Sequence, residues 1–479
     1  MTFTSLSYYL FLPAVYAVFH LSPERFRPAV LLGASYLFYS FLGAPQLIII
    51  LGGVTLASYY FALRMAAVTE EAGRWNLFRY GAFSCLALLG AVKLAPVLLP
   101  AGFRSEHSGL LVGAGVSYFV FQAVSYLADV YLGLQEPEPS LLTHSLALAF
   151  FPKLLQGPIE RASNLLPQLK VPYGFDYERT RRALLLFGFG LFKKIVVADR
   201  LGQYSDLVFG NLQSLTCAPV LIGTYAYAFQ IYFDFSGYTD MARGTALLFG
   251  INLAENFNSP YLSVSVADFW RRWHMTFSHW ILDYIFKPLQ LAWRDHGNAG
   301  TAAALLAAFL ASGLWHGISA GFIVWGLLHG VYLASSVYYR PWQKRLHGLL
   351  GGEKAPLVKA WRIFVTFNLV SLAWIFFRSP SLGDALAAVR AILNPAGTLA
   401  LARGMDPARF VYTHLTLQYG FAELAILAMA LGVVLLVRLM RDYPLFEKPA
   451  WVRWGVYYAL FALIVFFGVA RDNFIYLKF

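Results

Sequence analysis

Long apolar stretches recur from one end of the chain to the other, and short segments that hold most of the charged residues separate them. A helix that crosses a membrane needs about 20 mostly apolar residues, so the pattern predicts about eleven transmembrane helices. Three apolar pieces, 141–157, 244–254 and 278–292, are shorter or interrupted, and we expect tilted, re-entrant or buried half-helices there. The candidate spans are 8–20, 29–43, 45–63, 80–100, 109–127, 183–198, 217–235, 301–314, 318–338, 362–377, 418–438 and 451–470.

Composition indicates the same class. Of the 479 residues, 59% are hydrophobic and only 13% are charged, whereas soluble domains carry about 25% charged residues. The short alternating segments of a membrane β-barrel are not seen in the sequence. No internal repeat of fixed period indicates two related halves, as many transporters have. We therefore expect one all-α membrane domain over residues 1–479.

The net charge of +12 is the one feature that could suggest nucleic-acid binding. The basic residues lie in short loops between apolar runs, where they set the topology of a membrane protein. Arg25, Arg27 and the basic segment 159–182 are predicted to face the cytoplasm, which places the N-terminus outside. The two cysteines, Cys85 and Cys217, predict neither a disulfide framework nor a metal cluster.

The first unusual stretch is WRRWHMTFSHWILDY, residues 270–284. An ionisable side chain at bilayer depth costs roughly 2.5–3.5 kcal/mol, so such groups are expected to face an interior cavity. Ser265 and Asp268 form the pattern of a helix N-terminus and predict a helix from about 266. On a 3.6-residue period, one face of this helix is expected to carry Trp270, Trp273, His274, Phe277, Ile281 and Tyr284, and the other Arg272, Thr276, His279 and Asp283. The alternative is an interfacial amphipathic helix whose arginines bind lipid phosphates.

The second stretch is the apolar run 301–339, whose 39 residues are nearly twice what one span requires. Gly313, Gly317 and Gly321 mark where it is expected to break, and His316 lies in that break. A broken helix within a membrane is tolerated where its backbone is buried or lines a cavity. The alternative is that the glycines form a close-packing face and His316 is a hydrogen-bonded core histidine.

The third stretch, QIYFDFSGYTDMARG at 230–244, places Asp234 in an apolar span without an obvious local partner. We expect Asp234 to orient a histidine from another helix. Two imidazoles in a partly dry cavity suit proton abstraction from a hydroxyl group. The sequence contains no nucleophile elbow of a serine hydrolase, and its histidine and aspartate spacings match no metal-ligand pattern.

Four motifs resemble those of the membrane-bound O-acyltransferase family, in particular its bacterial branch that acetylates exported polysaccharides. They are DFWRRWHMTFSHWILDYIFKPL, GLWHGISAGFIVWGLLHG, FQIYFDFSGYTDMARG and ENFNSPYL. Further similarity, at 116–133, 150–161, 190–201 and 473–479, extends it over almost the whole chain. The resemblance implies a ring of transmembrane helices and half-helices around a central funnel.

The resemblance also implies roles for single residues. His316 matches the catalytic histidine of the family and is expected to act as general base, with His274 as its orienting or substrate-binding partner. The backbone at Gly313–Gly317 and the side chain of Asn258 are candidate donors to the developing charge on the thioester carbonyl. The residues predicted to bind substrate or donor are Asp234, Asn258, Arg271, Arg272 and Trp315. Two departures from the family pattern, His279 and Leu282, leave the outer contacts of this helix open.

The implied activity is transfer of an acetyl group from a cytoplasmic thioester, acetyl-CoA or an acyl carrier protein, across the membrane. The acceptor is expected to be an exported polysaccharide such as alginate, reached directly or through a periplasmic acetyl-carrier protein. This implies a multi-pass protein of the bacterial inner membrane with no bound cofactor or metal and no nucleic-acid partner. The alternatives are a teichoic-acid D-alanylation-type enzyme, a lipid O-acyltransferase, or, in another class, a solute or ion transporter.

Overall fold

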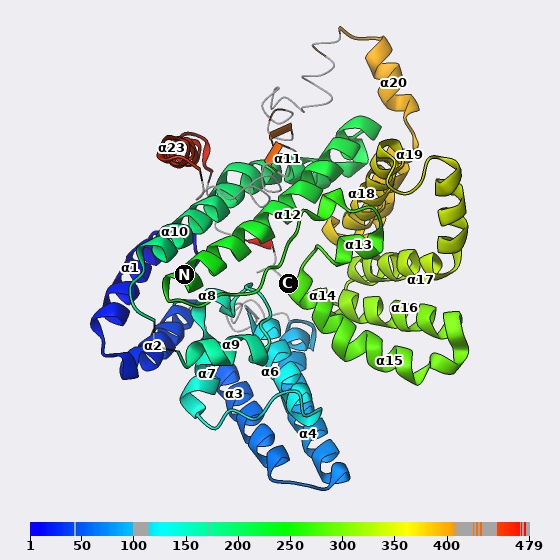
Figure 1. The fold of residues 1–479 in the computed structure, drawn as a ribbon. Helices are drawn as coiled ribbons and strands as arrows, with labels where there is room; N and C mark the ends of the chain where they lie inside the picture. Colours follow the sequence, from blue (N-terminus) through cyan, green and yellow to red (C-terminus); the bar gives the residue numbers. More distant parts are fainter. Residues whose placement is uncertain are drawn as a thin grey trace. The chain divides into compact units, whose positions relative to one another are not determined.

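The computed structural model describes residues 1–42, 45–98, 115–171, 173–406 and 448–469, together with a few isolated positions. Helices make up most of these ranges, and no strand occurs within them (Figure 1). The predicted all-helical class is therefore confirmed. The candidate span 418–438 lies almost wholly outside the described residues, as does the first part of 109–127.

The chain divides into two compact units. The first consists of residues 1–191, 237–255 and 470–479, and the second of residues 192–236 and 256–469. Each is described by itself below. The single domain expected from the sequence stays a prediction.

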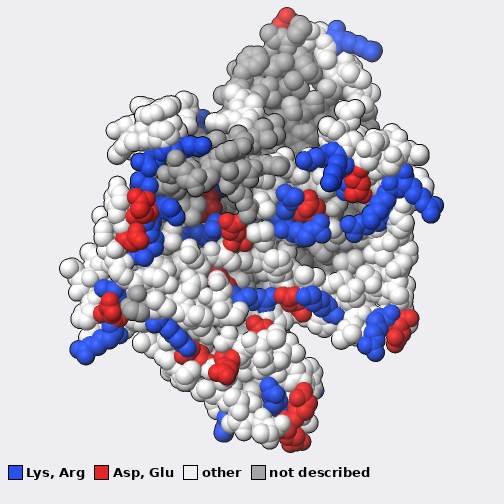
Figure 2. Space-filling view, viewed as in Figure 1, with Lys and Arg blue, Asp and Glu red and all other residues white. Residues whose placement is uncertain are grey.

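The first unit contains the N-terminal helices. They are α1 (Leu6–Leu21), α2 (Arg27–Ser40), α3 (Pro45–Ala66), α4 (Glu71–Leu98), α6 (Val116–Tyr131), α7 (Leu141–Ala149), α8 (Phe151–Leu154), α9 (Ala162–Leu169) and all but the last residue of α10 (Tyr177–Phe192). Helices α3, α4 and α6 pack together, and nearly every side chain of α6 is buried. Figure 2 shows charged side chains at the free end of the α3–α4 hairpin (lower end of the view), around Arg64, Glu70 and Glu71. This is where a membrane hairpin is expected to carry its charges.

The second unit begins with a π-helical turn, Lys193–Ala198, that runs directly into α11 (Asp199–Gly210). It continues with α12 (Cys217–Leu248), whose residues 237–248 belong to the first unit. The remaining helices are α13 (Val266–Trp270), α14 (Met275–Ile281), the π turn Leu282–Phe286, α15 (Lys287–Ala292), α16 (Gly297–His316), α17 (Ala320–Leu349), α18 (Pro356–Arg378), α19 (Leu382–Leu393), α20 (Ala396–Arg403) and α23 (Ala450–Phe467).

The long apolar run breaks where the glycines predicted. Helix α16 ends at His316, and α17 begins at Ala320 and returns beside it (Figure 1). The close-packing alternative holds as well. A Cβ atom at Gly313 would lie 2.5 Å from the carbonyl oxygen of Phe322, and one at Gly326 would lie 2.5 Å from that of Phe309. The glycines therefore allow the backbones of the two helices to approach closely.

Six helices among the described residues are long and apolar enough to cross a membrane, and the bent pair α19–α20 would make a seventh. The six segments are Gln46–Ala66, Glu71–Leu94, Arg294–His316, Ala320–Leu349, Pro356–Arg378 and Ala450–Phe467. Large apolar side chains on α3, α4 and α23, such as Ile49, Phe83 and Phe466, are exposed, as expected of surfaces that face lipid. The expected number of eleven spans stays a prediction.

The packing of α16 against α17 gives a first testable prediction. We expect Gly326→Ala to lower the free energy of unfolding by about 1–3 kcal/mol, because its methyl group overpacks the interface. Gly348→Ala is the matched control, since Gly348 lies on the same helix with nothing within 4 Å of its Cβ position. Thermal unfolding in detergent checks this: Gly326→Ala should lower Tm and the control should not. Equal Tm values for the two variants would contradict the packing described.

Candidate active site

The motif WRRWH does not lie on a continuous helix. Helix α13 begins as predicted, with Ser265 Oγ accepting a hydrogen bond from the Asp268 amide at 3.1 Å. It ends at Trp270, however, and α14 begins only at Met275. The prediction of one helical face from Trp270 to Tyr284 is therefore wrong, although most of the side chains assigned to that face are buried.

The interruption has a physical cause in the backbone of His274. His274 has φ 41° and ψ 54°, in the left-handed region that side chains other than glycine rarely adopt. Two backbone hydrogen bonds hold this segment against the loop 256–258: the Asn258 amide donates to the Arg272 carbonyl at 2.9 Å, and the Met275 amide donates to the Asn256 carbonyl at 2.9 Å. Strain of this kind persists where surrounding contacts over-determine it, and such positions cluster at active sites.

His274 lies in an almost completely buried aromatic setting. Its ring centroid is 4.7 Å from that of Phe235, edge to face, and 5.1 Å from that of Phe277, nearly parallel. Its Nδ1 atom lies 3.1 Å from Asn256 Oδ1. Burial lowers the pKa of His274 to about 3, so the imidazole is neutral near physiological pH.

His316 is the last residue of α16 and is also buried. Its ring centroid lies 4.9 Å from that of Phe377 on α18 and 5.0 Å from that of Trp325 on α17. The side chain therefore projects from the end of one helix into a wall formed by two others. The break between α16 and α17, which the sequence predicted, is what places a histidine at this helix end.

The two histidines share two aromatic neighbours. Trp315 and Phe277 stack with their centroids 4.4 Å apart. The Trp315 centroid is 4.5 Å from that of His316 and 6.4 Å from that of His274, and the Phe277 centroid is 6.4 Å from that of His316. Two residues 42 positions apart in the sequence thus meet around one aromatic pair.

Asp234 has a partner that sequence reasoning did not find. Its Oδ1 atom lies 2.7 Å from the Nζ atom of Lys194, which lies 2.7 Å from Oδ1 of Asp199 as well. All three side chains are buried. Lys194 stands in the π-helical turn, a feature often found at functional sites. Asp234 is therefore a counter-ion for a buried lysine, and its expected role in orienting a histidine stays a prediction. The pair of lysines in GLFKKIVVADRL was the available signal for the ion pair.

The two arginines predicted to bind substrate or donor both pair with Asp268. Nitrogen atoms of Arg271 and Arg272 lie 3.6 and 3.1 Å from Asp268 Oδ1, and the Arg271 side chain is largely exposed. Arg271 also lines, together with Phe277, an apolar cavity of about 270 Å³.

Asn258 contributes its amide to the backbone pairing with Arg272. Among the proposed backbone donors, the Gly317 amide is bonded to the Gly313 carbonyl at 3.3 Å. The residue that the sequence reasoning missed is Asn256, two positions before Asn258 in ENFNSPYL.

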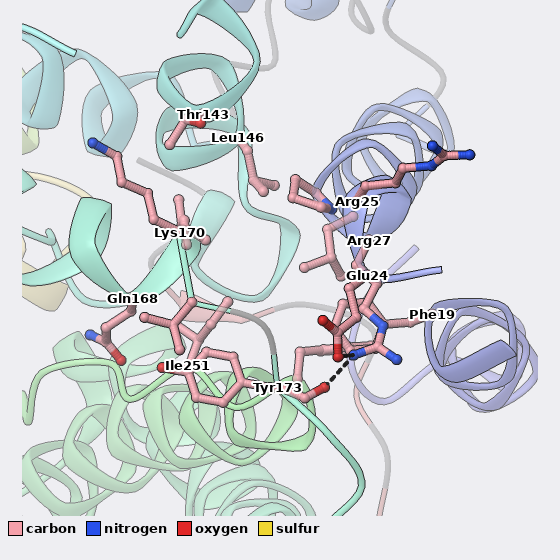
Figure 3. Close-up of a pocket in the computed structure, with 15 residues that line it drawn as sticks. Phe19, Glu24, Arg25, Arg27, Thr143, Leu146, Gln168, Lys170, Tyr173 and Ile251 are labelled. Atoms are coloured by element: carbon pink, nitrogen blue, oxygen red, sulfur yellow. Dashed lines mark hydrogen bonds and ion pairs between the residues drawn. The ribbon is translucent and has the colours of Figure 1, made fainter. Parts of the chain in front are cut away.

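A larger cavity, of about 380 Å³, lies in the first unit and has basic residues on its rim. Arg27 donates to the Tyr173 carbonyl at 2.6 Å, and Lys170 pairs with the buried Glu138 at 2.7 Å. Figure 3 shows the charged ends of Arg25 and Lys170 directed away from the cavity. The cations Arg27 and Lys170 thus hold loops together. Within the described ranges, no group of three or more histidine, cysteine, aspartate or glutamate side chains could hold a metal ion.

The buried ion pairs of Lys194 give the second prediction. Lys194→Met should lower the free energy of unfolding by about 3–5 kcal/mol, because it removes the cation between two buried carboxylates. Lys287→Met is the control, since Lys287 forms an exposed pair with Asp283 at 2.8 Å and should cost about 0.3–0.5 kcal/mol. Thermal and chemical unfolding of both purified variants checks this. Equal losses in the two variants would show that the buried cluster is not held together as described.

Comparison with known proteins identifies the family of this chain. The family model described as MBOAT, membrane-bound O-acyltransferase family, matches residues 117–377. The peptidoglycan O-acetyltransferase of Helicobacter pylori is 32% identical, over 76% of this chain and 73% of its own length. The probable alginate O-acetylase AlgI of Pseudomonas aeruginosa is 34% identical, over 78% and 71%. The teichoic acid D-alanyltransferase of Bacillus subtilis is 27% identical, over 68% and 82%. The chain therefore belongs to the membrane-bound O-acyltransferase family and is a multi-pass membrane O-acyltransferase.

Proposed function

We propose that this protein moves an acetyl group from a cytoplasmic thioester, acetyl-CoA or an acyl carrier protein, to a hydroxyl group of an exported polysaccharide. The observation that carries the proposal is the meeting of His274 and His316 around Phe277 and Trp315 in a member of an O-acyltransferase family. Buried imidazoles suit proton transfer at an oxygen atom.

In the proposed reaction, His316 takes the proton from the attacking hydroxyl group as the oxygen forms a bond to the thioester carbonyl carbon. The tetrahedral intermediate then collapses, the carbon–sulfur bond breaks, and the protonated His316 returns the proton to the leaving thiolate. The products are an acetyl ester and a free thiol, so atoms and charge balance. His274 orients the reacting group, and the indole N–H of Trp315 stabilises the developing oxyanion as a hydrogen-bond donor.

The relatives support a glycan as the proposed acceptor, because two of them are named for O-acetylation of alginate and of peptidoglycan. We infer an extracytoplasmic glycan acceptor, with alginate as the first polysaccharide to test, reached directly or through a periplasmic acetyl-carrier protein. We infer that the enzyme lies in the bacterial inner membrane. Arg271, exposed beside the apolar cavity, is the arginine of the motif that we propose contacts substrate or donor.

The third prediction tests the role of His316. In inverted membrane vesicles that enclose a glycan acceptor and receive radiolabelled acetyl-CoA from outside, His316→Ala should lower acetyl transfer by about 10²–10⁴-fold, the contribution of a general base. His296→Ala is the control, because His296 is an exposed histidine that directly precedes the first residue of the same helix, α16. Retained acetylation by a well-expressed, folded His316→Ala protein would contradict the proposal.

The same vesicle assay distinguishes between the candidate acceptors and between the candidate donors. A glycan acceptor should become labelled and membrane lipid should not, whereas labelled lipid would indicate a lipid O-acyltransferase. Replacing acetyl-CoA by a D-alanyl thioester of a carrier protein should give no product. Product from that donor would move the protein to the D-alanyl branch of the family.

A further inference from the structure

We propose that Asn256 is a positioning residue that fixes the tautomer of His274, with the ring proton on Nδ1 and Nε2 as the hydrogen-bond acceptor. The inference rests on the proposed function, because it assigns the direction in which His274 can bond to substrate. It is carried by hydrogen bonds around a single side-chain oxygen atom.

Three polar groups lie within hydrogen-bond distance of Asn256 Oδ1. They are the backbone amide of Thr276 at 3.2 Å, the hydroxyl of Thr276 at 2.8 Å and Nδ1 of His274 at 3.1 Å. A backbone amide can only donate, so the amide of Thr276 determines which end of the Asn256 side chain is the oxygen. The orientation of this side chain therefore does not depend on the histidine.

The tautomer follows from this orientation. A carboxamide oxygen accepts hydrogen bonds and cannot donate them, so Nδ1 of His274 must carry the hydrogen. The buried ring is neutral and has a single N–H group, which leaves Nε2 with a lone pair. His274 can thus accept a hydrogen bond from a substrate hydroxyl through Nε2, but it cannot donate through that atom to an oxyanion.

The position of Asn256 is itself tightly determined. The residue is buried, and its backbone carbonyl accepts the hydrogen bond from Met275, directly after His274. The backbone pairing between 256–258 and 272–275 does not involve the Asn256 side chain. A change of that side chain should therefore remove the bond to the imidazole and leave the backbone of His274 in place.

The fourth prediction is tested by ¹⁵N NMR of histidine-labelled protein in nanodiscs, with His274→Gln to assign the resonance. In the wild-type protein we expect Nδ1 of His274 in the protonated range and Nε2 in the unprotonated range. Asn256→Leu should shift the ring toward the other tautomer and lower kcat about 10–100-fold, the usual effect of losing an orienting partner, with little change in KM. Thr276→Val is the matched control. It removes the hydroxyl donor to Asn256 Oδ1 and keeps the contact between Asn256 and the imidazole ring of His274.

Asn256→Asp is the conservative rescue, since a carboxylate oxygen can accept the same hydrogen bond. At alkaline pH, where the ring stays neutral, this variant should retain the Nδ1–H tautomer and a kcat closer to that of the wild type than Asn256→Leu. A proton on Nε2 in the wild-type protein would overturn the inference, and so would an unchanged tautomer and kcat in Asn256→Leu. The wild-type spectrum decides even if Asn256→Leu does not fold. Because it needs no turnover, it also separates this inference from a failure of the proposed acetyl transfer.

Discussion

The structure of the candidate site depends on backbone hydrogen bonds between two loops. The hydrogen bonds between 256–258 and 272–275 hold His274 in a left-handed conformation directly before α14. That conformation is incompatible with one continuous helix through WRRWH. With His274 in this conformation, Phe277 stacks on Trp315, and His274 and His316 come to share the same aromatic pair. A single strained residue thus determines how the aromatic pair and the two histidines are arranged.

A second constraint is the cost of charge and of polar backbone away from water. The protein places Lys194 between Asp199 and Asp234, so that each buried carboxylate has a cation beside it. The long apolar run breaks at Gly317, and α17 packs back against α16, with glycines where the backbones of the two helices come close. The same break leaves the C-terminal end of α16 buried inside the protein, and His316 is the last residue of that helix.

The sequence predicted the features that depend on local chemistry. The helical membrane class followed from apolar runs, the cap at Ser265 from a known pattern, and the break after His316 from length and glycine spacing. It could not predict the break at His274, because a helical projection assumes a constant period and the contacts that disturb it come from residues 256–258. It missed the pair of Asp234 with Lys194 for a similar reason: the two residues are 40 positions apart. In each case a partner distant in sequence overrode a local pattern.

The proposed reaction requires that one bound substrate contacts the imidazoles of both His274 and His316. The most direct measurement is an electron cryo-microscopy map of the protein in nanodiscs with a non-hydrolysable acetyl thioester analogue. Density for the analogue's carbonyl group is expected against His316, His274 and the indole N–H of Trp315. An analogue bound at any other site, with the two histidines turned toward different surfaces of the protein, would contradict it.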